Sequence, residues 1–145
     1  MIEAVGARNI RSYMEVAHRM LAKDGAFLIQ AILGTGAPDV WLSTRIFPNG
    51  VLPSMRQLVD AMDGLFRISH VENFGLDYDK TLCAWERNFR EQWPEIKAIT
   101  GSSGAPLYDE RFYRMWRYYL LVCAGAFRSR KIDVAHIIFS KPALF

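Results

Sequence analysis

The stretch AFLIQAIL, residues 26–33, decides the fold class of this chain. It is an apolar run of strand length that Gly25 and Gly34 bound. Such a run is typical of a strand buried on both faces of a parallel sheet. Because parallel strands are joined by helices that cover the sheet, we expect the flanking segments to be helical. The sequence therefore predicts an α/β fold.

Helices and strands alternate on both sides of this run. Apolar residues recur at helical spacing over residues 9–23, ahead of the strand. After the strand, the sequence predicts a Gly/Pro-broken loop with the turn signal Asn49-Gly50, and then a short helix that follows Pro53-Ser54 and stops at Gly64. A strand over 66–73 comes next, followed by a helix that Asp79 caps and Pro94 ends. The last two predicted elements are a long helix over 109–128 and a strand over 132–139. Three strands do not cover the edges of their own sheet, so we expect part of a larger sheet.

Composition excludes several classes of function. The chain has 145 residues, a net charge of +3 and a pI of about 9.0, without the basic stripe of a nucleic-acid binder, so no nucleic-acid partner is expected. No run reaches the length of a membrane span and the N-terminus lacks the pattern of a secretion signal, so we expect a cytoplasmic protein. Cys83 and Cys123 have no metal-ligand spacing to each other or to histidine, and no metal site is predicted.

Two polar side chains near predicted strand ends are candidates for ligand binding. Gln30 lies near the C-terminal end of the strand over 26–33, where open α/β sheets bind ligands. A core amide satisfied by neighbouring backbone explains Gln30 equally well. Tyr78, in FGLDYDKT, follows the strand over 66–73, where a phenol can bind a small anion or its ring can face a cation. Simple packing of Tyr78 is the alternative.

Three further features have functional and structural interpretations. Glu3 lies on the turn of MIEAVG directly before a helix, and chemistry in α/β folds gathers at strand-to-helix turns. The loop GTGAP, residues 34–38, lacks the third glycine of a dinucleotide loop, and Pro38 breaks the helix that would have to follow. A solvated face explains the cations of the last helix and its end, and a surface for phospholipid headgroups is the alternative; these cations are Arg111, Arg114, Arg117, Arg128, Arg130 and Lys131.

Five stretches occur in a fixed order along the chain: MIEAVG, RIFPNGVLPS, NFGLDYDKTLCAWERNF, ERFYRMWRYYLLVCAGAFRSRKI and IIFSK. Together they resemble the cyclopropane-fatty-acyl-phospholipid synthases, and IFPNG.LPS and YYL..CAGAFR are specific motifs. The resemblance covers nearly the whole chain, except the loop around ITGSSGAPL. It implies the C-terminal part of a class I (Rossmann-like) S-adenosylmethionine-dependent methyltransferase sheet, with three strands and flanking helices. Residues 1–145 would then be the C-terminal half of the catalytic domain, without the cofactor-binding N-terminal half.

The resemblance also implies a reaction and a site. The family transfers a methylene group from S-adenosylmethionine to the cis double bond of a phospholipid acyl chain, which places the protein at the inner face of the membrane. A bound bicarbonate takes the proton whose loss closes the ring. By motif, Glu3 and Tyr78 match side chains of the bicarbonate site, Ile32 matches a position that contributes backbone, and Gln30 falls where many members have a histidine. Glutamine can donate and accept hydrogen bonds, so Gln30 can help to bind an anion. Because glutamine does not titrate near neutral pH, its presence argues against a proton relay.

Two main functions remain open from the sequence, beside a basic module that binds lipid surfaces through the cations named above. The glycine-rich loop that binds S-adenosylmethionine in the family is absent from the 145 residues, so a synthase fragment inactive on its own is the first hypothesis. The alternative is a non-catalytic or split-gene product that associates, through an exposed sheet edge, with a separate N-terminal half or with itself. Cys123, in CAGAFR, matches a family cysteine, and its apolar neighbours favour packing over nucleophilic chemistry.

Overall fold

Two compact units make up the chain in the computed structural model, which describes residues 2–36, 39–48 and 50–142. The strand unit comprises the chain up to Gly75 together with the segment from Lys131 onward, and the helical unit is Leu76–Arg130. Asn49, Ala37 and Pro38 lie outside the described residues, so the expectations for the Asn49-Gly50 turn and for the end of GTGAP are described only in part. The candidate residues Glu3, Gln30 and Ile32 belong to the strand unit, and Tyr78 belongs to the helical unit.

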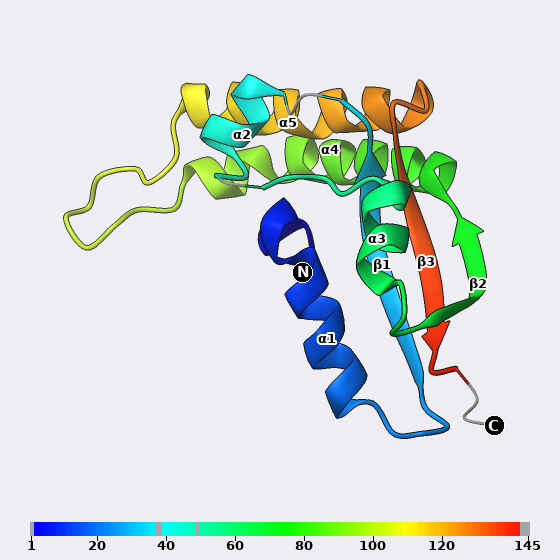
Figure 1. Cartoon of the computed structure of the whole chain (residues 1–145). Helices are drawn as coiled ribbons and strands as arrows, with labels where there is room; N and C mark the ends of the chain where they lie inside the picture. The colour runs from blue at the N-terminus through cyan, green and yellow to red at the C-terminus, as the bar shows by residue number, and fades with distance from the viewer. Residues whose placement is uncertain (1, 37–38, 49, 143–145) are drawn as a thin grey trace. The chain divides into compact units, whose positions relative to one another are not determined.

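A three-stranded sheet forms the strand unit. Its strands are β1 (Ala26–Gly34), β2 (Arg67–Asn73) and β3 (Ile132–Ser140), in the order β1-β3-β2. β3 lies between the other two strands and runs antiparallel to both (Figure 1). The prediction of three strands in an α/β fold is confirmed.

The expectation of a parallel sheet buried on both faces is wrong for β1. Its described partner is antiparallel, and its burial alternates, with Ile29 4% exposed and Leu28 51% exposed. An apolar run reports the burial of a strand but not the direction of its partner, and the partner β3 lies about a hundred residues further along the chain. The two strands that do run parallel, β1 and β2, are separated by β3.

Three helices and two short 3-10 turns complete the strand unit. The turns are η1 (Ile2–Ala4) and η2 (Ala7–Asn9), and the helices are α1 (Ile10–Met20), α2 (Val40–Arg45) and α3 (Met55–Met62). α3 begins with a capping box in which Ser54 and Gln57 satisfy each other's backbone N–H groups. α2 was not expected, because it lies in the Gly/Pro-rich segment. Asp39 starts it by accepting a hydrogen bond from the N–H of Leu42 at 2.8 Å.

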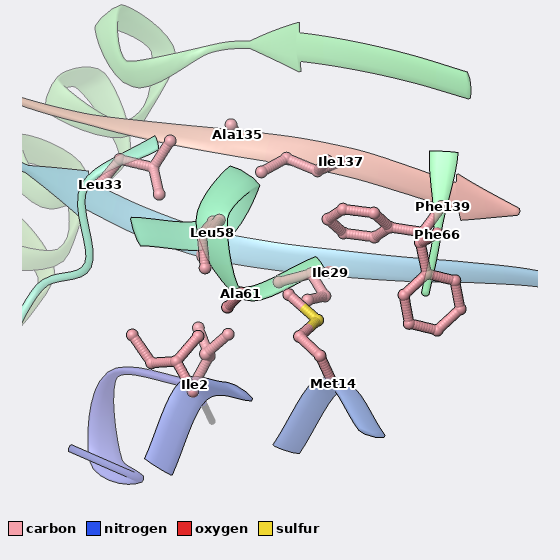
Figure 2. Packing of buried hydrophobic residues seen from close by; sticks show 12 residues of the cluster. Ile2, Met14, Ile29, Leu33, Leu58, Ala61, Phe66, Ala135, Ile137 and Phe139 are labelled. Atoms are coloured by element: carbon pink, nitrogen blue, oxygen red, sulfur yellow. The ribbon is translucent and has the colours of Figure 1, made fainter. Parts of the chain in front are cut away.

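The core of the strand unit covers one face of the sheet. In Figure 2, Ile2 and Met14 point toward the strands, and Phe66 lies against Phe139. The ring centroids of Phe66 and Phe139 are 5.8 Å apart. The buried members of this core are Ile2, Ile10, Met14, Ile29, Ala31, Leu33, Leu58, Ala61, Phe66, Ala135, Ile137 and Phe139. Since all its members on β1 and β3 have odd numbers, the even-numbered residues of these strands form the opposite face.

Two long helices form the helical unit, α4 (Gly75–Lys97) and α5 (Glu110–Arg128), and they lie side by side in Figure 1. Aromatic rings pack between them, as Trp93 and Tyr113 show with centroids 4.8 Å apart. The long helix predicted over 109–128 is confirmed, and Asp109 caps it by accepting a hydrogen bond from the N–H of Phe112.

The predicted boundaries of α4 are wrong at both ends. The helix begins at Gly75, whose N–H donates to the carboxylate of Asp133 at 2.9 Å, so the cap comes from a residue distant in sequence. Asp79 therefore lies inside the helix. Pro94 also lies inside it, four residues after the exposed Arg90, whose carbonyl is left without its helical N–H donor by the proline.

Two of the cations assigned to a solvated face form ion pairs within the helical unit. Arg128 donates to the buried carboxylate of Asp79 at 2.9 and 3.0 Å, and Arg117 pairs with the buried Glu86. The hydrogen bonds from Arg128 hold the pKa of Asp79 below its ordinary value, against the opposing effect of burial. These arginines therefore join α5 to α4. Four other cations are exposed and remain candidates for binding phospholipid headgroups: Arg111, Arg114, Arg130 and Lys131.

Candidate functional site

The carboxylate of Glu3 is fixed to strand β1. Its Oε1 accepts a hydrogen bond from the backbone N–H of Ile32 at 2.9 Å, and its carbonyl accepts one from the N–H of Val51 at 3.0 Å. Partial burial raises the pKa of Glu3, but the hydrogen bonds from the N–H groups of Ile32 and of Glu3 itself oppose it, and the pKa lies below the ordinary value. Glu3 is therefore an ionised hydrogen-bond acceptor at neutral pH.

Ile32 takes part through its backbone alone. In β1, the even-numbered residues Ile32 and Gly34 direct their N–H groups away from β3, one to Glu3 and the other to the carbonyl of Pro53 at 3.1 Å. The structure thus brings Glu3 and Ile32 together, as the motif comparison predicts. The N–H of Ile32 binds the Glu3 carboxylate and so fixes the position of its charge.

Gln30 lies two residues before Ile32 on the same face of β1. It is exposed, and its carboxamide Oε1 lies 2.8 Å from Nε2 of His136. The interpretation of Gln30 as a core amide bonded to backbone is therefore wrong. The pairing register explains the contact, because Gln30 and His136 are directly opposite each other on β1 and β3.

His136 is a residue that reasoning from the sequence did not place in the site. It lies on the central strand, opposite Gln30 on β1 and opposite Glu72 on β2. Its ring meets the ring of Phe74 edge-on, with centroids 4.6 Å apart. A usable signal is present in the sequence: within IDVAHIIF, as within AFLIQAIL, a single polar residue lies between apolar residues in the middle of the strand.

Tyr78 lies in the first turns of α4 and packs within the helical unit. It is half-buried, with its ring centroid 5.0 Å from that of Phe127 and 6.1 Å from that of Trp85. The packing interpretation thus describes its ring. That its hydroxyl joins Glu3, Gln30 and Ile32 in one site stays a prediction.

The described part of the chain offers neither a metal site nor a membrane-spanning helix. Within it, no three or more His, Cys, Asp or Glu side chains are grouped so that they could hold a metal ion. None of the helices in the described ranges is long and apolar enough to cross a membrane.

Comparison with known proteins gives a consistent result. Residues 1–137 match the family described as mycolic acid cyclopropane synthetase. A cyclopropane-fatty-acyl-phospholipid synthase of Escherichia coli (strain K12) is 43% identical over 145 residues, which is 97% of this chain and 36% of that protein. The chain therefore spans little more than a third of the length of this curated relative.

Solved structures agree with the sequence comparison. The cyclopropane synthase MmaA2 from Mycobacterium tuberculosis superposes with a TM-score of 0.83 at 24% identity, over 96% of this chain and 52% of that one. The mycolic acid cyclopropane synthase CmaA1, solved in complex with SAH and CTAB, gives the same TM-score and coverage at 27% identity. The two units described above, each taken by itself, thus have the fold of about half of each of these two proteins.

Proposed function

Because this chain belongs to the mycolic acid cyclopropane synthetase family, we propose that the natural protein containing it transfers a methylene group from S-adenosylmethionine to the cis double bond of a phospholipid acyl chain. The observation that carries the proposal is the ionised Glu3 fixed on the N–H of Ile32, in a chain 43% identical to a phospholipid synthase. Since the substrate is a membrane lipid, we place the protein at the inner face of the membrane, attached peripherally.

The cofactor is bound by residues that this chain does not contain. S-adenosylmethionine supplies the one-carbon unit that becomes the ring methylene. GTGAP lacks the third glycine of a nucleotide loop, and no glycine-rich loop occurs elsewhere in the 145 residues. The residues present therefore do not by themselves fit the cofactor. They correspond to the C-terminal half of a methyltransferase catalytic domain.

The strand unit contributes an anion site for the proton-removing step. Ring closure requires loss of a proton from a cationic intermediate, and a bound bicarbonate can take that proton and become carbonic acid. Glu3 only accepts hydrogen bonds, so it binds the O–H of bicarbonate. The amide N–H groups of Gln30 donate to another oxygen, and a contribution of the Tyr78 hydroxyl stays a prediction from the resemblance. An anion held in this way stabilises a nearby cation strongly where water is excluded.

The test is to express the natural gene in bacterial cells that lack their own cyclopropane synthase. We expect membrane phospholipids whose monounsaturated acyl chains have gained one methylene group as a ring, measured by gas chromatography and mass spectrometry of the fatty acids. A vector without the gene is the control. Unchanged fatty acids, with the protein present at normal levels, would contradict the proposal.

The 145-residue chain alone is expected to transfer no methylene group. The reason is the missing nucleotide site, since positioning of the donor supplies much of the rate in two-substrate reactions. The measurement is incorporation of label from methyl-tritiated S-adenosylmethionine into phospholipid vesicles. An enzyme-like rate of incorporation by the isolated chain would refute the assignment of cofactor binding to other residues.

A second candidate function is association without catalysis. The observation that favours it is the part of the β1 edge before Ile32, since in the described residues β1 pairs with β3 on one side only, and on its other side Ile32 and Gly34 already donate to Glu3 and Pro53. Unpaired strand edges associate with other strands, so a split-gene fragment would bind a separate N-terminal half or a second copy of itself. We expect dimers or larger species of the isolated chain in sedimentation velocity. A well-folded chain that stays strictly monomeric at all concentrations would count against this function.

A further inference from the structure

Three polar side chains form a row across the sheet, on the face opposite the core. Gln30 on β1, His136 on β3 and Glu72 on β2 are register partners, and directly opposed residues project to the same face. The neighbouring row on this face consists of Leu28, Ile138 and His70, so apolar side chains flank Gln30 and His136, and a second histidine flanks Glu72. His136 is the middle member of the row and belongs to the strand that is paired on both sides.

The contact between Gln30 and His136 determines which end of the carboxamide is available to a ligand. Oε1 of Gln30 lies 2.8 Å from Nε2 of His136. A carboxamide oxygen only accepts, so the ring nitrogen must carry the hydrogen and donate it. With its oxygen bonded to the ring, Gln30 directs its two amide N–H donors away from His136. If the carboxamide were rotated, its oxygen would face the ligand and repel an anion.

The ring of His136 is held in the orientation that this bond requires. Its edge-on contact with Phe74 has a centroid distance of 4.6 Å. The backbone of Phe74 is bonded to the central strand, because its N–H donates to the carbonyl of Val134 at 3.0 Å. Because its ring packs against Phe74, His136 on β3 can select one rotamer of the flexible Gln30 on β1. A donor fixed in this way binds an anion at a lower cost in side-chain entropy.

We propose that His136 is a positioning residue that holds Gln30 with its amide donors toward bicarbonate. The proposal rests on the proposed function, since it assigns a role within the same anion site. His136 acts through Gln30 and does not itself take the proton. The Gln30–His136 pair thereby supplies a fixed donor, although Gln30 itself cannot titrate.

The experiment uses the natural protein and measures ring formation in phospholipid vesicles as a function of bicarbonate concentration. In His136→Leu the ring donor is removed, and we expect the bicarbonate concentration for half-maximal rate to rise about tenfold, the effect of one net hydrogen bond. In His136→Gln the side chain can still donate to Gln30, and we expect a value within about threefold of the natural protein. His70→Leu, at an exposed histidine of β2, is the matched control and should change nothing.

His136→Phe keeps a ring beside Phe74 but removes the nitrogen donor, and it provides a second test should His136→Leu fold poorly. We expect the same rise of about tenfold in the bicarbonate concentration for half-maximal rate. An unchanged bicarbonate dependence in His136→Leu would overturn the positioning role while leaving the proposed function in place. Equal impairment of His136→Gln and His136→Leu would also overturn it. Absence of ring formation by the natural protein itself would reject the proposed function and this role with it.

Discussion

Replacement of Phe139 by alanine is expected to lower the free energy of unfolding by about 3–5 kcal/mol. Phe139 is fully buried on β3, and its ring centroid lies 5.9 Å from that of Phe27 and 5.8 Å from that of Phe66. Truncation removes the apolar burial of one aromatic ring and leaves a cavity between two others, which the rigid sheet cannot close. Urea unfolding of the purified protein, followed by circular dichroism, measures the change.

Phe47→Ala is the matched control for this substitution. Phe47 is 50% exposed, and we expect its truncation to cost less than about 1 kcal/mol. Similar losses for the two variants would show that the core is not organised around β3 as described. A large loss confined to Phe139→Ala supports the assignment of odd-numbered residues to the buried face and, with it, the assignment of Gln30 and His136 to the other face.

The second large effect is expected from Glu3→Gln, which should lower kcat of the natural protein by about 100- to 1,000-fold. The amide has almost the same shape and can still accept the hydrogen bond from Ile32, so the substitution removes the charge and keeps the position. Without a carboxylate, the O–H of bicarbonate loses its acceptor and the cationic intermediate loses a nearby negative charge. Initial rates of ring formation in phospholipid vesicles measure the effect.

Glu15→Gln is the control for loss of a carboxylate. Glu15 is on α1, in an exposed ion pair with Arg11 at 2.9 Å, and pairs of this kind contribute little to stability. We expect full activity from this variant. A Glu3→Gln protein with unchanged melting temperature and full activity would exclude Glu3 from the anion site.

Much of the fold could be predicted from the sequence, because periodicity is a local signal. The helical spacing of Phe112, Trp116 and Leu120 and the apolar run over 26–33 identify their elements without knowledge of the rest of the chain. The errors arose where residues distant in sequence determine a helix boundary or the pairing of a strand. Asp133 caps α4 from β3, so the helix starts before Asp79, and the antiparallel partner of β1 is the last strand of the chain.

The candidate site could be predicted only in part. Gln30 stood out as a polar residue in an apolar strand, and Glu3 by its place on a turn. Ile32 acts through its N–H, and a backbone donor leaves no trace in residue type, so only the motif comparison indicated it. His136 was missed because its role depends on strand register, which neither stretch specifies alone.

The position of the transferred carbon tests the central claim most directly. The natural protein would be incubated with S-adenosylmethionine labelled with ¹³C at the methyl group and with unsaturated phospholipid vesicles, and the product examined by NMR. We predict the label in the ring methylene of a cyclopropane within the acyl chain. Label on a headgroup nitrogen, or none in the lipid, would contradict the assignment of this chain to methylene transfer at acyl double bonds.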